Sequence, residues 1–173
     1  SASLAMRQLA AIMFSDMEGY TALMQQNEQL AKAARQRLKV VLETCVPAYR
    51  GKILEYVGDG ALSIFNSSVD AVNCAVEIQQ AVMQAPKVPL RIGIHSGDIS
   101  IEDDGIYGDG VNLAARIESL AVSGCVLISE KVYDDISNQS NMKVREIGYF
   151  EFKNVIKPVR IFALAHQGLV VPE

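Results

Sequence analysis

The chain has 173 residues, of which half are hydrophobic and 21% are charged. This length suits one domain with a sizeable core, and the composition is that of a folded protein, which excludes an intrinsically disordered chain. The net charge of −4 excludes a strongly basic surface for nucleic acid or an anionic membrane, so a phosphate-bearing ligand would have to be held by local groups and metal.

The first part of the chain predicts a strand, a long helix and a hairpin. The apolar run 9–15 indicates a buried strand that ends in Ser-Asp. Residues 20–49 follow with apolar side chains at helical spacing, which predicts one long helix. Residues 52–57 and 61–65 are strand-like, and the sequence Gly-Asp-Gly at 58–60 predicts the turn between them.

The second part predicts further helices and strands in alternation. Ser68 or Asp70 is expected to cap a helix that ends before Pro86. The remaining predicted elements are, in chain order, a strand 90–101 interrupted at 97–98, a polar loop 102–105, a helix 110–121, a strand 126–128, a short helix 130–136 and an antiparallel pair 144–152 and 159–165.

This order of elements predicts an α+β fold. Strand, helix, strand, strand, helix, strand is the order of a ferredoxin-like βαββαβ core, here followed by a C-terminal extension. We expect a mostly antiparallel sheet with the helices packed on one face. Such a fold supports many unrelated functions, so the function has to be argued from individual residues.

Two carboxylates occupy positions that suit a metal site. Asp16 lies where the first strand ends, and Asp59 lies at the tip of the hairpin. In a ferredoxin-like core the first strand and the hairpin are neighbours, so both carboxylates can meet at one edge of the sheet. Mg²⁺ and Mn²⁺ are often held by one or two carboxylates plus substrate phosphates. The alternative interpretation is that Asp16 caps a helix and Asp59 is a turn residue.

The segment after Asp16 is a candidate phosphate-binding turn. Gly19 lets the backbone approach a ligand closely, and Tyr20 and Thr21 open the first helix, whose free amides and dipole favour a polyphosphate. These three residues are therefore predicted to bind substrate.

Three blocks of the sequence resemble the signature blocks of class III nucleotidyl cyclases, the adenylate and guanylate cyclases. The blocks are FSDMEGYT at 14–21, GDG at 58–60 and YGDGVNLAAR at 107–116. A lone GDG would be weak evidence, but three blocks in the family's order, with suitable elements between them, are specific. The similarity extends from about residue 9 to residue 164.

The resemblance also suggests a domain organisation. Residues 6–166 are identified as a class III nucleotidyl cyclase catalytic domain, residues 1–5 as a cloning remnant and residues 167–173 as a C-terminal tail. No apolar run reaches the roughly 20 residues of a membrane-spanning helix, so we expect a cytoplasmic domain without membrane contact. We also expect this domain to be part of a larger regulated protein. Three cysteines are interpreted as free core thiols: Cys45, Cys74 and Cys125.

The resemblance implies a metal site with two ions, Mg²⁺ or Mn²⁺. Asp16 and Asp59 match the family's metal-binding aspartates, and the backbone carbonyl of Met17 would be a further ligand. With two metals, one ion lowers the pKa of the ribose 3′-hydroxyl and the other neutralises the departing pyrophosphate. Such phosphoryl transfer needs positioning and charge stabilisation, and it needs no Ser/His/Asp triad.

The resemblance implies three further substrate contacts. Asn112 matches the residue that orients the ribose, and Arg116 matches the arginine that stabilises the α-phosphate in the transition state. Lys153 matches a lysine that contacts the terminal phosphates. In this family, the metal aspartates and the Asn/Arg pair of one active site come from different subunits. We therefore expect a homodimer that converts a nucleoside triphosphate to a 3′,5′-cyclic nucleotide and does not bind nucleic acid.

The choice of base depends on two positions. Cyclases that make cyclic AMP usually have Lys before the GDG turn and Asp or Thr before the Asn/Arg helix, but this chain has Glu55 and Gly105 there. A carboxylate can accept hydrogen bonds from the N1–H and amino group of guanine, whereas it cannot donate to adenine N1. The pocket therefore slightly favours GTP over ATP. Asp104 could serve in place of Gly105 if the loop shifts by one residue.

Two other readings remain open from sequence. The domain could be a catalytically silent cyclase-like module that binds nucleotide or dimerises, or an unrelated ferredoxin-like phosphoryl transferase. The metal aspartates argue against the first, and the absence of a Gly-Gly-Asp-Glu-Phe signature argues against the second. His95 and His166 are interpreted as a turn residue and a surface residue, not as catalysts.

Overall fold

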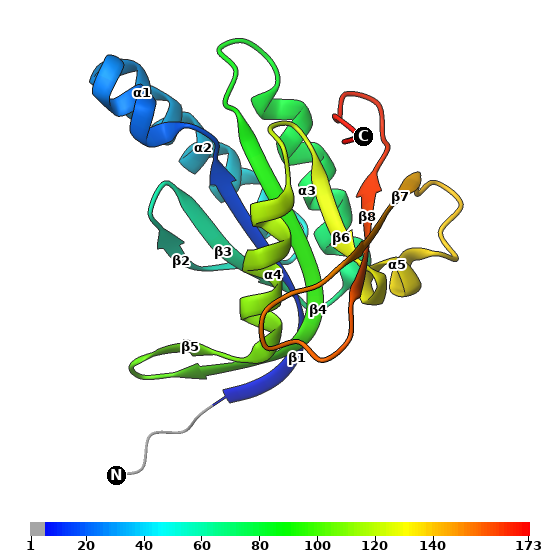
Figure 1. Ribbon diagram of the computed structural model, residues 1–173. Coiled ribbons are helices and arrows are strands. Elements are labelled where there is room, and N and C mark those ends of the chain that lie inside the picture. Colours follow the sequence, from blue (N-terminus) through cyan, green and yellow to red (C-terminus); the bar gives the residue numbers. More distant parts are fainter. Residues whose placement is uncertain (1–5) are drawn as a thin grey trace.

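The computed structural model describes residues 6–173 (Figure 1). Residues 1–5, which the sequence suggests are a cloning remnant, lie outside the described residues. The elements are, in chain order, β1 (Met6–Met17), α1 (Tyr20–Gln26), α2 (Glu28–Ala48), β2 (Lys52–Val57), β3 (Gly60–Phe65), α3 (Ser68–Val82), β4 (Leu90–Glu102), β5 (Gly105–Tyr107), α4 (Asp109–Leu120), β6 (Val126–Ser129), α5 (Glu130–Ile136), β7 (Val144–Phe150) and β8 (Val159–Leu164).

The strands form one mixed sheet in the order β2-β3-β1-β4-β6-β8-β7, with β5 paired to β4 outside this path. The part β2-β3-β1-β4 is the ferredoxin-like core, and β6, β8 and β7 extend it. Every pair is antiparallel except β4 with β6. The predicted α+β class with a mostly antiparallel sheet is therefore confirmed.

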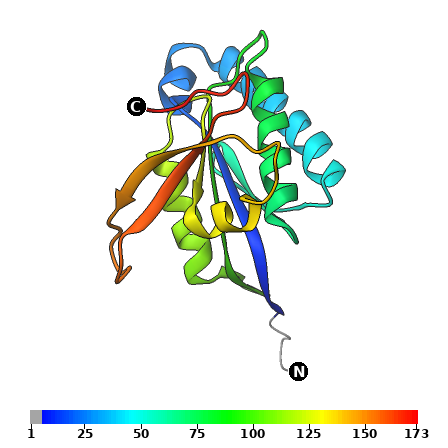
Figure 2. The ribbon, with the colours of Figure 1, turned by 90° about the vertical axis from the view of Figure 1, so that its right-hand side faces the viewer.

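The helices cover both faces of the sheet, so the expectation that they pack on one face is wrong in this detail (Figure 2). Ala11 and Met13 of β1 belong to the cluster that contains α2 and α3, whereas Ala10 and Ile12 pack with α4 on the opposite face. Successive side chains of a strand point to opposite faces. Because β1 is apolar at both sets of positions, each face needs a helical cover.

The long helix expected over 20–49 is two helices. Asn27 lies between them in an extended conformation, with φ −154° and ψ 93°, and its side chain accepts a hydrogen bond from the N–H of Leu30 at 3.1 Å. Asparagine is a strong N-cap because its side chain satisfies a free amide of the first turn. The chain therefore changes direction between α1 and α2, and the apolar periodicity of α2 does not reveal this.

Several predicted boundaries also change. β4 runs without interruption through Gly97, because this part of the strand pairs with β1. β1 itself is longer than the predicted strand 9–15 and begins at Met6. The loop expected at 102–105 is a tight turn that leads into β5, and β7 ends two residues earlier than predicted. α3 begins at Ser68, but its capping side chain is Ser67, which accepts a hydrogen bond from the N–H of Asp70.

The prediction for the cysteines agrees with the structure. All three cysteines are free and buried. Within residues 6–173, no helix combines the length and the apolar character needed to cross a membrane. The segment after β8 lies against the domain, where the N–H of Val170 donates to the carbonyl of Gly124.

Candidate active site

The register between β1 and β3 brings Asp16 and Asp59 together. Ser15 lies opposite Ala61, so Asp16 is next to Gly60 and the turn residue Asp59. The two strands approach so closely that a Cβ added to Gly60 would lie 1.8 Å from the carbonyl oxygen of Ser15. Only glycine fits at this position, and the Gly-Asp-Gly turn therefore fixes where the Asp59 carboxylate lies.

The electrostatics of this pair suit a divalent cation. Burial, and after it the neighbouring carboxylate of Asp16, raises the pKa of Asp59 to about 7. Asp16 accepts a hydrogen bond on Oδ2 from Arg91 at 3.2 Å, but its Oδ1 is buried without a partner. A positive ion between the two carboxylates would relieve their repulsion and satisfy this oxygen.

The metal-ligand set from the protein is small. Within residues 6–173, no group of three or more His, Cys, Asp or Glu side chains is arranged to hold a metal ion. Two carboxylates leave coordination positions for a backbone carbonyl, water and substrate oxygens, which is the way Mg²⁺ is usually bound. Asp16 and Asp59 therefore fit the predicted type of ion.

Two charged residues beside this pair were not predicted from the sequence. Arg91 lies directly opposite Asp16 in the β1–β4 ladder, and their ion pair is half-buried. Glu118 of α4 is 6% exposed, and burial raises its pKa. α4 lies so close to β4 here that a Cβ on Gly93 would be 2.4 Å from the Glu118 amide nitrogen. Only the strand register could have indicated the role of Arg91.

The turn between β1 and α1 contains the residues that were predicted to bind phosphate. Gly19 has φ 75°, a conformation that favours glycine, and it precedes the first helical residue Tyr20. Met17 is buried at the end of β1, and Thr21 is exposed in the first turn of α1. The N–H of Glu18 is already bonded to the carbonyl of Pro89 at 2.8 Å and is not free for a ligand.

Asn112, Arg116 and Lys153 gather around a separate cavity of about 690 Å³. Asn112 and Arg116 are one helical turn apart on the outer face of α4, and Arg116 donates a hydrogen bond to the backbone carbonyl of Lys153. Lys131 and Lys157 also line this cavity and make it positively charged. It could accept a phosphate group.

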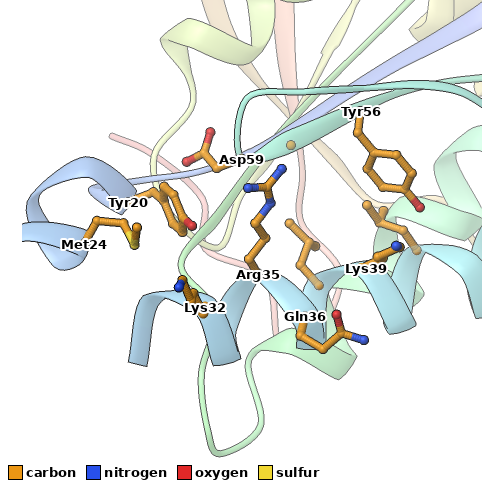
Figure 3. A pocket seen from close by; sticks show the side chains of 11 residues that line it. Tyr20, Met24, Lys32, Arg35, Gln36, Lys39, Tyr56 and Asp59 are labelled. Carbon is orange, nitrogen blue, oxygen red and sulfur yellow. The ribbon is translucent and has the colours of Figure 1, made fainter. Parts of the chain in front are cut away.

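Asp59 faces a different pocket, of about 480 Å³, which lies between the hairpin and helices α1 and α2 (Figure 3). The two cavities share no lining residue. Within one chain, Asp59 and the Asn112/Arg116 pair therefore lie beside two different cavities.

The two positions expected to read the base lie outside both cavities of the single chain. Glu55 is exposed on β2, opposite Leu62 of β3. Gly105 begins β5 with φ 155°, and Asp104 lies in the preceding turn.

His95 was predicted to be a turn residue, and the structure shows that this is wrong. It lies within β4, is buried, and its Nδ1 is 2.8 Å from the Oγ of Ser129. Burial lowers its pKa to about 4, so the imidazole is neutral at pH 7. His166 accepts a hydrogen bond from the N–H of Lys143 at 3.2 Å and fixes the local backbone near the C-terminus.

Comparison with known proteins gives a consistent result. The family described as the adenylate and guanylate cyclase catalytic domain matches residues 5–165. Putative adenylate cyclase 3 of Rhizobium meliloti is 40% identical over 164 residues, which cover 90% of this chain and 28% of that protein. The chain therefore spans less than a third of the length of this relative.

Two solved structures show the same fold. An adenylate/guanylate cyclase/hydrolase from Silicibacter pomeroyi superposes with a TM-score of 0.85 at 32% identity, covering 98% of this chain and all of that one. The adenylyl cyclase CyaB from P. aeruginosa gives a TM-score of 0.83 at 23% identity, with 96% and 100% covered. From its sequence match, its fold and the arrangement of its site, the chain belongs to the adenylate and guanylate cyclase catalytic domain family.

Proposed function

We propose that this domain converts a nucleoside triphosphate to a 3′,5′-cyclic nucleotide and pyrophosphate, with GTP slightly favoured over ATP. The observation that carries the proposal is the Asp16–Asp59 pair, which combines a raised pKa with a buried carboxylate oxygen that has no partner. Family membership and the retained residues Asn112 and Arg116 support the same chemistry.

Asp16 and Asp59 would hold two Mg²⁺ or Mn²⁺ ions, with the carbonyl of Met17 as an additional ligand. When bound, the ions supply the positive charge that activates the 3′-hydroxyl and stabilises the leaving pyrophosphate. Arg91 orients the Asp16 carboxylate, because its guanidinium is 3.2 Å from Oδ2. Gly19 leaves room for the triphosphate at the start of α1.

The second half of the site would come from another copy of the chain. Asn112 orients the ribose, Arg116 stabilises the charge that develops on the α-phosphate, and Lys153 binds the terminal phosphates. The separation of the two cavities within one chain supports this assignment. A symmetric dimer would place each metal pair next to the Arg116 cavity of the other copy and form two complete sites.

Glu55 supports the preference for GTP, because a carboxylate accepts hydrogen bonds from guanine and cannot donate one to adenine N1. ATP is the alternative substrate, since the 40% identical relative is named a putative adenylate cyclase. We further propose that the domain works on the cytoplasmic side as the signalling output of a longer protein, which agrees with the part of that relative it covers.

Product analysis tests the proposal directly. Purified protein is incubated with ATP or GTP and Mn²⁺, and the products are identified by mass. We expect cyclic GMP to form faster than cyclic AMP. Asp16→Ala should reduce the rate on the order of a thousandfold, because the metal clamp contributes several kcal/mol to the barrier. Absence of both products from folded, dimeric wild-type protein would instead favour a silent regulatory domain.

A further inference from the structure

The segment that follows β8 crosses one end of the sheet and contacts both of its faces. We call residues 166–171 the C-terminal strap. Leu169 packs against the cluster that contains α2 and α3, whereas Val171 packs against the cluster that contains Ile117 and Ala121 of α4. In Figure 2 this segment, drawn in red, runs across the top of the molecule from the side of α3 toward the side of α4. The strap therefore joins the two helical layers.

Hydrogen bonds fix the strap to the elements beneath it. The side-chain amide of Gln80 in α3 donates to the carbonyl of Gln167 at 3.0 Å. The N–H of Val170 donates to the carbonyl of Gly124 at 3.0 Å. A Cβ added to Gly124 would lie 2.9 Å from Cγ2 of Val170. The strap therefore lies directly on residues 121–125, the loop between α4 and β6.

This loop sets where α4 ends. The N–H of Val122 donates to Sγ of the buried Cys125 at 3.2 Å, which closes the loop behind the helix. Arg116 lies in the C-terminal half of α4, close to the part of the helix that shares a cluster with the strap. Because a helix moves as a rigid element, a displacement of its end also displaces Arg116.

The metal half of the site has supports of its own. Leu90, at the start of β4, lies opposite Met17 in the β1–β4 ladder, and its carbonyl accepts a hydrogen bond from the buried side-chain amide of Gln79 at 2.8 Å. Arg91 follows Leu90 and pairs with Asp16. The strand that carries Arg91 is therefore held by β1 and α3, whereas the end of α4 depends more on the strap.

We propose that the C-terminal strap positions Arg116 for catalysis by holding the end of α4 against the sheet. The inference rests on the proposed function, in which Arg116 of one copy serves the metal-bound nucleotide of the other. The strap acts through α4, so its loss should slow the chemical step and leave binding of metal and nucleotide at Asp16 and Asp59 largely unchanged. Placement errors of about 1 Å that begin far from the reacting atoms can cost large factors in rate.

The first test removes the two apolar anchors from the full chain. Leu169→Ser combined with Val171→Ser should lower kcat roughly tenfold, with little change in KM for the Mn²⁺–nucleotide complex. Val171→Ser alone should give a smaller loss and is the milder variant if the double one does not fold. Val171→Ile should keep the wild-type kcat, because it retains an apolar contact with α4. Val40→Ser is the matched control, because Val40 is 53% exposed on α2.

Mixed dimers distinguish a positioning role from a general loss of stability. In an equal mixture of Asp16→Ala and Arg116→Ala chains, the intact site takes its Arg116 from the Asp16→Ala chain. The double strap variant on that chain should lower the recovered activity roughly tenfold. The same variant on the Arg116→Ala chain should leave the recovered activity unchanged. Any other pattern, such as an equal loss in both mixtures, would overturn the inference.

Hydrogen exchange gives a readout that does not need activity. Amides of residues 117–125 should exchange roughly tenfold faster in the double strap variant, because their local opening becomes easier, and amides of β1 and β3 should not change. If wild-type protein makes no cyclic nucleotide but this exchange increases, the proposed function fails and the hold of the strap on α4 stands. If product forms and the double variant keeps the wild-type kcat, the strap assignment alone fails.

Discussion

The raised pKa of Asp59 predicts that this residue destabilises the metal-free fold at neutral and alkaline pH. The pKa rises from 3.8 to about 7 on folding, chiefly through burial and then through Asp16. The folded state therefore binds a proton more tightly than the unfolded state, and stability is lost as the pH rises through this window. Asp59→Asn cannot ionise, so it should escape this cost.

The magnitude follows from the shift. About three pH units correspond to about 4 kcal/mol for a fully buried group, and partial exposure of Asp59 to solvent reduces this to about 1–2 kcal/mol. For a chain of this size the melting temperature should rise by about 4 °C. The assay is thermal unfolding in EDTA at one protein concentration, from pH 4 to pH 8.

We expect the melting curves of wild type and Asp59→Asn to converge near pH 4, where both side chains are neutral, and to separate at pH 8. Added Mn²⁺ should reverse the order, because it stabilises only the protein that retains both carboxylates. Asp103→Asn, in the exposed turn before β5, is the control. If Asp59→Asn melts at or below the wild-type temperature in EDTA at pH 8, the two carboxylates do not repel each other as described.

Two further predictions concern the substrate and the assembly. Glu55→Lys combined with Gly105→Asp should raise kcat/KM for ATP relative to kcat/KM for GTP by roughly tenfold or more, since a hydrogen-bond donor replaces an acceptor. If this ratio does not change, these positions do not read the base. Asp16→Ala and Arg116→Ala should each be inactive, yet an equal mixture should recover up to about a quarter of wild-type activity, because half of the dimers are mixed and each has one intact site. Background activity after verified subunit exchange would rule out a shared site.

The sequence by itself determined the class of the fold, and it predicted the candidate site residues. Hydrophobic periodicity located most strands and helices, because it records which side chains are buried. The Gly-Asp-Gly turn was predictable from local chemistry, and the structure adds the reason for its second glycine. At Gly60 the backbone of β1 is too close for any side chain, which is a contact between residues far apart in sequence.

Tertiary structure decided what local patterns cannot record. The break at Asn27 depends on a side-chain cap that competes with a continuous helix. The placement of α4 on the face of the sheet opposite to α2 and α3 follows from the two apolar faces of β1. The partnership of Arg91 with Asp16 follows from the register between β1 and β4, which joins residues 75 positions apart. Periodicity describes one element at a time, whereas the charges around a site depend on how separate elements are paired. For this reason the sequence predicted Asp16 and Asp59 as candidates, and only the folded chain showed Arg91 beside Asp16.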